Sequence, residues 1–268
     1  MAKKINTLAA VPQKNTLSKG NLEIIFQLVK GEFKLRYKSS LLGYFWTLFK
    51  PLMLFGVIYL VFSVFLQSPM QNYAVYLLLG IVLWTFFTEA TMTGMNSLIS
   101  KRDLITKIFF PRENLVYAAN LSSLITLLLN LIIFAIFYLG SGLMPGWASL
   151  LFIPYLLLLF IFTTGISLIL ASLYARFHDL SHIWEVILQI LFWITPIVYD
   201  LSFVPEKYRD WLYLNPMTQF ISFSRRIFLI DQVPSLKQHL VLLTVSLGTF
   251  AIGYFFFKKQ EYKVAEMI

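Results

Sequence analysis

Residues Leu115–Ala175 read LVYAANLSSLITLLLNLIIFAIFYLGSGLMPGWASLLFIPYLLLLFIFTTGISLILASLYA, 61 residues without one Asp, Glu, Lys or Arg. The core of a soluble domain does not hold so long an uncharged run, so we expect this segment to lie in lipid. A helix needs about 20 apolar residues to cross a hydrocarbon core of about 30 Å, so the run predicts two crossings. The Gly- and Pro-rich stretch Gly140–Gly146 predicts the turn between them.

The composition agrees with a membrane protein. Of 268 residues, 58% are hydrophobic and 13% are charged, and the mean hydropathy is +0.73. Soluble domains carry about 25% charged residues, so the composition predicts an all-α polytopic membrane protein. The net charge of +9 is interpreted through the positive-inside rule, and no nucleic-acid partner is expected. The sequence has no cysteine, which excludes disulfides and thiolate chemistry.

Four further crossings complete the prediction. The uncharged run Pro51–Thr88, broken at Gln67–Asn72, predicts a second hairpin. Ile183–Tyr199 is a marginal span, and Leu240–Phe257 is a final uncharged one. We therefore predict six transmembrane helices within a domain over 41–268.

The distribution of basic residues predicts the orientation. Seventeen of the 22 Lys and Arg residues fall on one predicted face: nine precede Pro51, four lie within 100–115, one is Arg176 and three follow Phe257. The positive-inside rule places that face in the cytoplasm. We expect a multi-pass protein of the cytoplasmic (inner) membrane with both termini cytoplasmic.

Residues 1–40 are predicted to form a cytoplasmic N-terminus with an amphipathic interfacial helix that contacts membrane lipids. Its apolar residues recur at helical spacing: Leu22, Ile25, Phe26, Val29, Phe33 and Tyr37. The alternative is a soluble packing helix.

The aromatic segment Leu201–Ile230 differs from the other outer connections. It is expected either to re-enter the membrane as short helices, between the fifth and sixth crossings, or to form a folded outer cap.

One group of residues and one single residue are candidates for a catalytic or metal-binding role. The string His178, Asp179, His182 and Glu185 has spacing that brings three metal ligands to one helix face, but a charged loop-to-helix junction explains it too, and no metal site is predicted. Glu89 is a candidate because it is an ionisable group within a predicted span, and a plain helix-end carboxylate is the alternative. The sequence has neither a phosphate-binding G-x-x-x-x-G-K-[ST] loop nor a G-x-S-x-G motif. We therefore expect no ATP hydrolysis on this chain.

Four sequence pieces together resemble one family. They are RYKSSLLG at 36–43, followed by Trp46 and Pro51; LITKIFFPR at 104–112; Q-x-x-F-W-x-T-P-I-V-Y at 189–199; and LNPM at 214–217. In this order they resemble the permease subunit of ABC-type polysaccharide exporters, which move O-antigen, capsule or teichoic acid chains. His178 departs from the pattern, because the family usually has Arg directly before the residue that is Asp179 here.

The resemblance implies a half-transporter without a cofactor of its own. It would pair with a second copy of itself and with two cytoplasmic ATPase subunits that bind ATP and Mg, and its substrate would be a lipid-linked polysaccharide. The resemblance also implies outer gate helices within Leu201–Ile230 and a coupling helix seated on the ATPase. The residues assigned to that coupling helix are Lys101, Arg102, Asp103, Leu104, Ile105, Lys107 and Ile108. From composition alone, this loop fits a lipid surface as well as a partner's groove.

A sliding polymer needs a continuous path, and aromatic faces stack on sugar C–H surfaces without fixing them. The residues predicted to line such a path are Phe55, Tyr59, Phe62, Phe192, Trp193 and Tyr199. The alternative is that these rings face lipid or form interfacial belts.

The leading hypothesis is therefore an ATP-driven permease for lipid-linked polysaccharide, O-antigen or a related glycan. A teichoic acid exporter of the same family is the alternative. A membrane-embedded enzyme acting on lipid-linked sugars and an ion-coupled transporter remain as other readings, and the scarcity of buried ionisable groups argues against the second of these.

Overall fold

The computed structural model describes residues 23–32, 43–67, 70–107 and 110–267. Within these ranges every regular element is helical, which confirms the all-α membrane fold. Residues 23–32 form a first helix. The others are α2 (Gly43–Tyr59), η1 (Leu60–Phe65), α3 (Tyr73–Ser100), α4 (Arg102–Lys107), α5 (Glu113–Gly140), η2 (Trp147–Leu151), α6 (Phe152–Tyr174), α7 (Leu180–Ile194), η3 (Leu201–Phe203), α8 (Glu206–Tyr213), α9 (Pro216–Leu229) and α10 (Leu236–Met267).

Five helices of the described chain are long and apolar enough to cross a membrane: Phe45–Phe65, Tyr73–Ser100, Glu113–Gly140, Trp147–Tyr174 and Leu236–Glu261. The predicted crossing Ile183–Tyr199 is instead the 15-residue helix α7 followed by non-helical backbone. Fifteen residues rise about 22 Å, which is less than the hydrocarbon core. The count of six crossings therefore stays a prediction.

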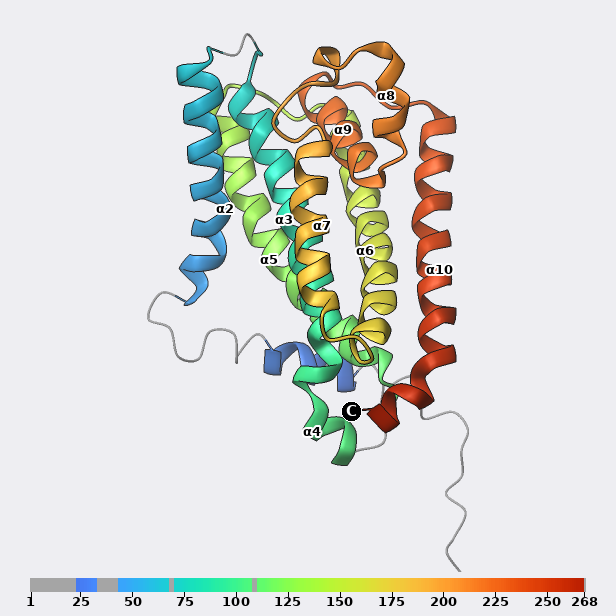
Figure 1. Cartoon of the computed structure of the whole chain (residues 1–268). Coiled ribbons are helices and arrows are strands. Elements are labelled where there is room, and N and C mark those ends of the chain that lie inside the picture. Colours follow the sequence, from blue (N-terminus) through green and yellow to red (C-terminus); the bar gives the residue numbers. More distant parts are fainter. Residues whose placement is uncertain (1–22, 33–42, 68–69, 108–109, 268) are drawn as a thin grey trace, which may run out of the picture.

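The long helices run alternately up and down in one bundle, with α2 and α10 at opposite edges and α7 between them (Figure 1). The helix over 23–32, α4 and the end of α10 lie at one end, which we call the α4 end. The segment of η3, α8 and α9 lies at the other end, and we call it the cap. The predicted outer segment is thus a group of short helices, and its depth in the bilayer stays a prediction.

Small residues set the closest helix contacts. A Cβ atom added to Gly253 of α10 would lie 2.2 Å from the Gly165 carbonyl oxygen of α6, so the two backbones touch. Similarly, a Cβ atom on Gly94 of α3 would lie 2.6 Å from Cβ of Ser167, whose hydroxyl donates to Asn120 Oδ1 at 3.2 Å. Helices in lipid associate by such close packing and by hydrogen bonds between them. This packing joins α3, α5, α6 and α10 into one block.

The absence of cysteine makes the orientation directly testable. We expect a single cysteine at Ser141, in the α5–η2 turn, to react with an impermeant thiol reagent applied to whole cells. A cysteine at Thr106 of α4 should react only after the membrane is opened, because the two positions lie at opposite ends of the bundle. Reaction at Thr106 in intact cells would reverse the predicted orientation.

Candidate functional site

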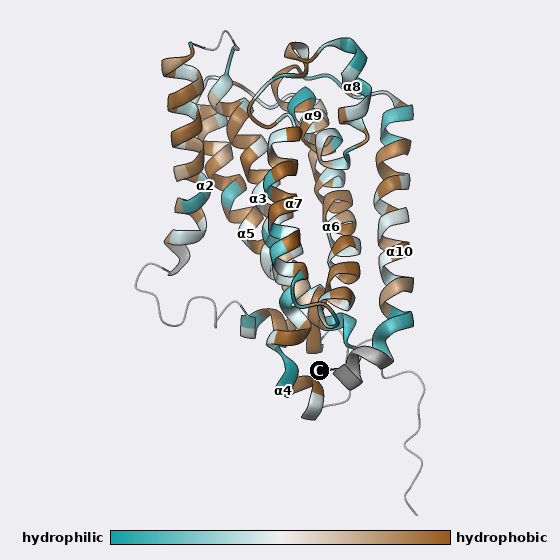
Figure 2. Ribbon diagram, viewed as in Figure 1, coloured by the Kyte–Doolittle hydropathy of each residue, from teal (hydrophilic) through white to brown (hydrophobic). Residues whose placement is uncertain are grey.

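A groove of about 1160 Å³ lies between α2, α3 and α7. Its lining combines aromatic, polar and charged side chains: Trp46, Thr47, Lys50, Pro51, Leu54, Trp84, Thr85, Thr88, Glu89, Met92, Thr93, Glu185, Leu188, Gln189, Phe192 and Trp193. Hydrophilic positions interrupt the apolar surface of α2 and α7 along this part of the bundle (Figure 2). The groove is the candidate functional site.

The floor of the groove is a polar stripe along α3. Thr85, Glu89 and Thr93 recur every four residues and Thr88 follows Thr85 by three, so the four side chains lie along one side of the helix. Thr88 donates to the Thr85 carbonyl at 2.9 Å and Thr93 donates to the Glu89 carbonyl at 2.8 Å. A hydroxyl oxygen that donates can still accept a hydrogen bond, and that of Thr93 also lies 3.2 Å from the Ser123 hydroxyl of α5. The stripe can therefore hydrogen-bond a polar ligand.

The α7 wall is fixed by its contacts with α3. Trp184 Nε1 donates to Thr91 Oγ1 at 3.1 Å, Leu188 is buried, and the Phe192 ring meets the edge of Trp84 at 6.0 Å between centroids. These residues anchor one side of α7. The neighbouring side therefore presents Glu185, Gln189 and Trp193 to the groove.

The groove is partly open. Trp193 is 62% exposed in the single chain, and Lys50, Glu185 and Gln189 are exposed as well. Ionised and amide groups at membrane depth face water or protein rather than lipid, because lipid offers them no hydrogen bonds. The open side must therefore be covered by water, a ligand or another protein surface.

Of the six aromatic residues predicted to line a substrate path, the structure places two in the groove. Phe192 and Trp193 line the groove, whereas the other four residues are absent from its lining. Phe55 is buried, stacks on Tyr59 at 5.6 Å and meets the edge of Phe137 at 5.5 Å.

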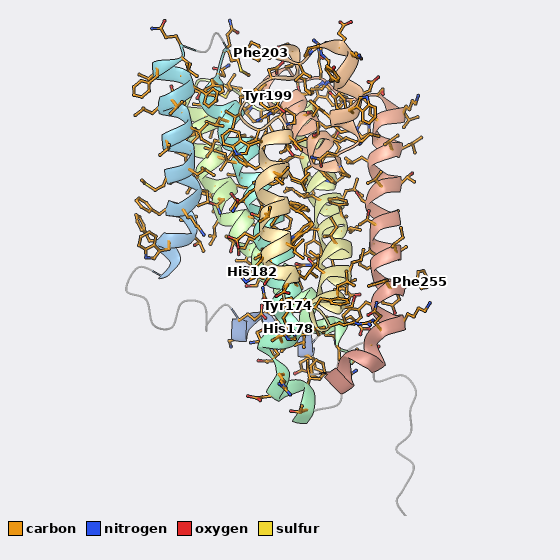
Figure 3. All side chains as sticks on the ribbon, in the orientation of Figure 1. Tyr174, His178, His182, Tyr199, Phe203 and Phe255 are labelled. Atoms are coloured by element: carbon orange, nitrogen blue, oxygen red, sulfur yellow. The ribbon has the colours of Figure 1, made fainter. Side chains whose placement is uncertain are left out.

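Further from the groove, Tyr59 also stacks on Tyr73, and Phe62 is partly buried against the main core. Tyr199 lies towards the cap end (Figure 3), where its hydroxyl donates to the Ile194 carbonyl at 2.8 Å. That these four residues line a substrate path stays a prediction.

The sequence analysis named aromatic residues for the substrate path, and so it missed most of the polar residues that line the groove. The signal was present: Thr and Glu at three- and four-residue spacing within an apolar span mark a polar helix face. Glu89 and Glu185 were singled out separately, and the structure brings both to the groove. What the sequence could not show is that α2, α3 and α7 meet around them.

At the cap end, a buried arginine holds the segment that follows α7. Arg225 of α9 is 5% exposed, and its guanidinium donates to the carbonyls of Pro196 at 2.5 Å and Ile197 at 2.7 Å, and to that of Tyr76 at 3.1 Å. It also lies over the Tyr76 ring, 3.3 Å from its centroid. A buried charge is tolerated when it is hydrogen-bonded in this way.

Two tyrosines of α3 complete the same arrangement. Tyr73 donates to the Val198 carbonyl at 3.0 Å and Tyr76 donates to the Tyr199 carbonyl at 2.9 Å. The four consecutive carbonyls of 196–199 are thus all bonded by side chains, which replaces the helical hydrogen bonds that this backbone lacks. We call this set of contacts the Arg225 clasp.

The motifs TPIVY and LNPM meet beside the clasp. Asn215 Oδ1 caps α9 by accepting from the Met217 amide at 3.0 Å, and Pro216 occupies the first turn, where no amide donor is needed. Asn215 Nδ2 donates to the Thr195 hydroxyl at 2.8 Å. One residue therefore begins α9 and fixes it to the end of α7.

At the α4 end, the two faces of α4 differ in their exposure to solvent. Leu104 and Ile105 are half-buried and pack against a core cluster that also contacts Ile24 and Leu28 of the helix over 23–32. Arg102 and Asp103 are exposed, and Lys101 is half-buried. Lys107 belongs to α4, whereas Ile108 lies outside the described residues. The apolar side of α4 is thus partly covered by its own chain, whereas Arg102 and Asp103 on its other side are exposed.

Charges also link the start of α5 to the end of α10. Lys258 Nζ lies 2.6 Å from Glu113 and 3.0 Å from Glu261, and Arg112 donates to the Glu261 carbonyl at 2.6 Å. Glu113 is largely buried. Arg112 and the first turn of α5 are therefore tied to α10.

The His178–Glu185 string does not assemble. The His178 ring is tilted against that of Tyr174, 5.9 Å between centroids, just before α7 (Figure 3), whereas Glu185 lines the groove. Among the described residues no three His, Cys, Asp or Glu side chains are grouped closely enough to hold a metal ion.

Comparisons with known proteins agree on one family. A family model described as ABC-2 type transporter matches residues 23–229. The O-antigen export system permease protein RfbA of Myxococcus xanthus is 28% identical over 247 residues, covering 91% of this chain and 95% of that protein. RfbA of Klebsiella pneumoniae is 28% identical over 260 residues, covering 93% and 98%. The polysialic acid transport protein KpsM of Escherichia coli is 21% identical over 235 residues, covering 86% and 90%.

The Arg225 clasp predicts a large difference between two adjacent arginines. Arg225→Met should lower the free energy of unfolding by roughly 2–5 kcal/mol, because buried carbonyls lose their donors. Arg226→Met should cost about 1 kcal/mol or less, because Arg226 is half-buried and its side chain makes one long hydrogen bond within the described part of the chain, to Gln238 at 3.4 Å. Unfolding of both variants by SDS in mixed micelles measures the difference, and equal losses would contradict the clasp.

Proposed function

Since the chain belongs to the ABC-2 type transporter family, we propose that it is the permease half of an ATP-driven exporter that moves a lipid-linked polysaccharide, O-antigen or a related cell-surface glycan, across the cytoplasmic membrane. The observation that carries this proposal is the groove. Threonine hydroxyls and the Gln189 amide can exchange hydrogen bonds with sugar hydroxyls, and the indoles of Trp46 and Trp193 can stack on sugar rings. The names of the two RfbA relatives support the same substrate class.

The open side of the groove supports pairing with a second copy. A two-fold axis facing the groove would bring the same surface of two chains together, which is the commonest symmetry of soluble homo-oligomers and serves here by analogy. The two grooves would then enclose one lumen and keep Lys50 and Glu185 away from lipid. A lumen of this kind suits a polymer that is too long to be enclosed in a pocket.

Energy would reach the lumen through α4. The chain lacks a phosphate-binding loop, and we propose that two ATPase subunits bind ATP and Mg on the cytoplasmic side. The exposed side of α4, with Arg102 and Asp103, is the docking surface that the fold leaves available. Binding and hydrolysis of ATP would displace α4, and the two copies would rock against each other. This chain itself would make and break no covalent bond.

The two sides of α4 should respond differently to mutation. Exchanging the charges with Arg102→Glu and Asp103→Lys should reduce co-purification of the ATPase roughly tenfold, about 1.4 kcal/mol, and leave the membrane level of the permease unchanged. Leu104→Asp should instead lower the permease level, because Leu104 packs against its own chain. Unchanged co-purification after the charge exchange would place the ATPase elsewhere.

Export itself is tested at Trp193. Deleting the chain should abolish surface polysaccharide, and Trp193→Ala should restore it roughly 2- to 10-fold less well than the wild type, because a stacking face is lost. Stability should change little, since Trp193 is 62% exposed. Tyr59→Ala is the matched control: its ring packs on Phe55 and Tyr73, so this change should cost about 2 kcal/mol of stability instead. Surface polysaccharide that survives deletion would refute the proposed function.

A further inference from the structure

Charged residues at the α4 end of the bundle, where α10 also ends (Figure 1), join α10 to the start of α5. Lys258 Nζ of α10 lies 2.6 Å from Glu113 of α5 and 3.0 Å from Glu261 of its own helix. Arg112, the residue before α5, donates to the Glu261 carbonyl at 2.6 Å. The side chain of Glu113 is 11% exposed and that of Lys258 33%, so water screens their attraction less than that of a surface pair. We call these four residues the Lys258 tether.

The α10 end of the tether is firmly held. Earlier on the same helix, Gly253 touches the Gly165 carbonyl of α6, which a Cβ atom would approach to 2.2 Å. Phe257, next to Lys258, is 1% exposed and belongs to the core cluster that also contains Leu115 of α5. Close backbone contact of this kind holds helices together in lipid. α10 can therefore serve as a fixed support for the start of α5.

The tether lies just beyond α4 in the chain. On its α3 side, α4 follows after Lys101 alone. On its α5 side, the described chain resumes at Phe110, which is 9% exposed in the same core cluster, and it reaches the tether at Arg112. α4 is therefore connected to one long helix at each end: to α3, which carries the floor of the groove, and to α5, which the tether ties to α10.

We propose that the Lys258 tether stiffens the α5 connection, so that a displacement of α4 rocks the whole copy instead of bending this connection. The inference rests on the proposed function, in which two copies rock against each other. A force applied to α4 divides between its two connections. The α3 connection is a single residue, whereas the α5 connection is longer and is held by Phe110, Arg112 and Glu113.

The tether has the form that such transmission requires. Coupling between distant sites is carried by packed side chains, ion pairs and rigid helices, and a rigid-body rotation needs each of these to move together. The tether joins α5 to α10, and α10 is packed on α6, so α4 is linked to the central block through both of its ends. Lys258 is thus a positioning residue for coupling, because it acts through the position of α4.

The test compares export with ATP hydrolysis. Glu113→Gln with Lys258→Met removes both partners of the closest pair, so the buried carboxylate is not left unpaired. Surface polysaccharide is measured on cells that lack the native chain, and ATP hydrolysis on the permease–ATPase complex in lipid nanodiscs, both per amount of permease. Export should fall roughly 3- to 30-fold, as is typical of mutations within coupling networks, while hydrolysis changes by less than about twofold.

Two further variants separate coupling from stability. Lys258→Arg keeps a cation in the tether and should retain at least about half of the export of the wild type. Lys259→Met removes the neighbouring lysine, which is exposed, and should change neither export nor hydrolysis by more than about twofold. A tether that served folding alone would change the amount of permease in the membrane and leave the ratio of export to hydrolysis as it is in the wild type.

The inference is overturned if the double variant keeps the wild-type ratio of export to hydrolysis, whether or not the amount of permease falls. It is also overturned if Lys259→Met lowers that ratio equally, or if Lys258→Arg lowers it as far as the double variant does. In each of these cases, loss of surface polysaccharide on deletion of the chain would still uphold the proposed export function. Intact surface polysaccharide after deletion would refute that function separately.

Discussion

The guanidinium of Arg225 is buried among backbone carbonyls, and this one desolvated charge fixes how three segments meet. Without its donors, the carbonyls of Pro196 and Ile197 would be buried and unpaired, which costs about 1–3 kcal/mol for each group. α7 can therefore end short of a full membrane crossing only because α9 and α3 supply hydrogen bonds to the backbone that follows it. Gly80 shows how closely the space is filled, since a Cβ atom there would lie 2.5 Å from Nη2 of Arg225.

The clasp also determines the shape of the groove. Because the backbone after α7 is bonded to α3 and α9, the cap end of α7 cannot drift away from the floor of the groove. Further along, Trp184 and Leu188 hold α7 against α3. The position of Trp193 and Gln189 relative to the polar stripe is thus a consequence of contacts outside the groove. A polar site within a membrane bundle requires this support, because apolar packing alone does not orient it.

The sequence predicts the class of fold because membrane spans depend on local composition. Leu115–Ala175 needs only its length and lack of charge to be recognised as two crossings. The side chains of the groove depend on which faces of α2, α3 and α7 meet, and hydropathy carries little information about that. The apolar residues of α4 illustrate the same limit: by composition Leu104 and Ile105 fit a lipid surface or a partner's groove, and the structure adds that they pack, half-buried, against their own chain. Arg225 was missed because nothing in the sequence distinguishes it from the neighbouring Arg226 or from the other basic residues of this aromatic segment.

One helix connects the clasp, the groove and α4. α3 carries Tyr73 and Tyr76 of the clasp at the cap end, the polar stripe in its middle, and α4 directly after its last turn, where the Leu104 and Ile105 amides both bond to the Lys101 carbonyl. Only Lys101 separates α4 from α3, so the proposed displacement of α4 would reach the stripe along α3 itself. α3 is held in turn against α5 and α6 by the contacts around Gly94 and Ser167. α2 lies at the edge of the bundle and packs mainly on α3, so the width of the groove depends on this one interface more than on any part of the central block.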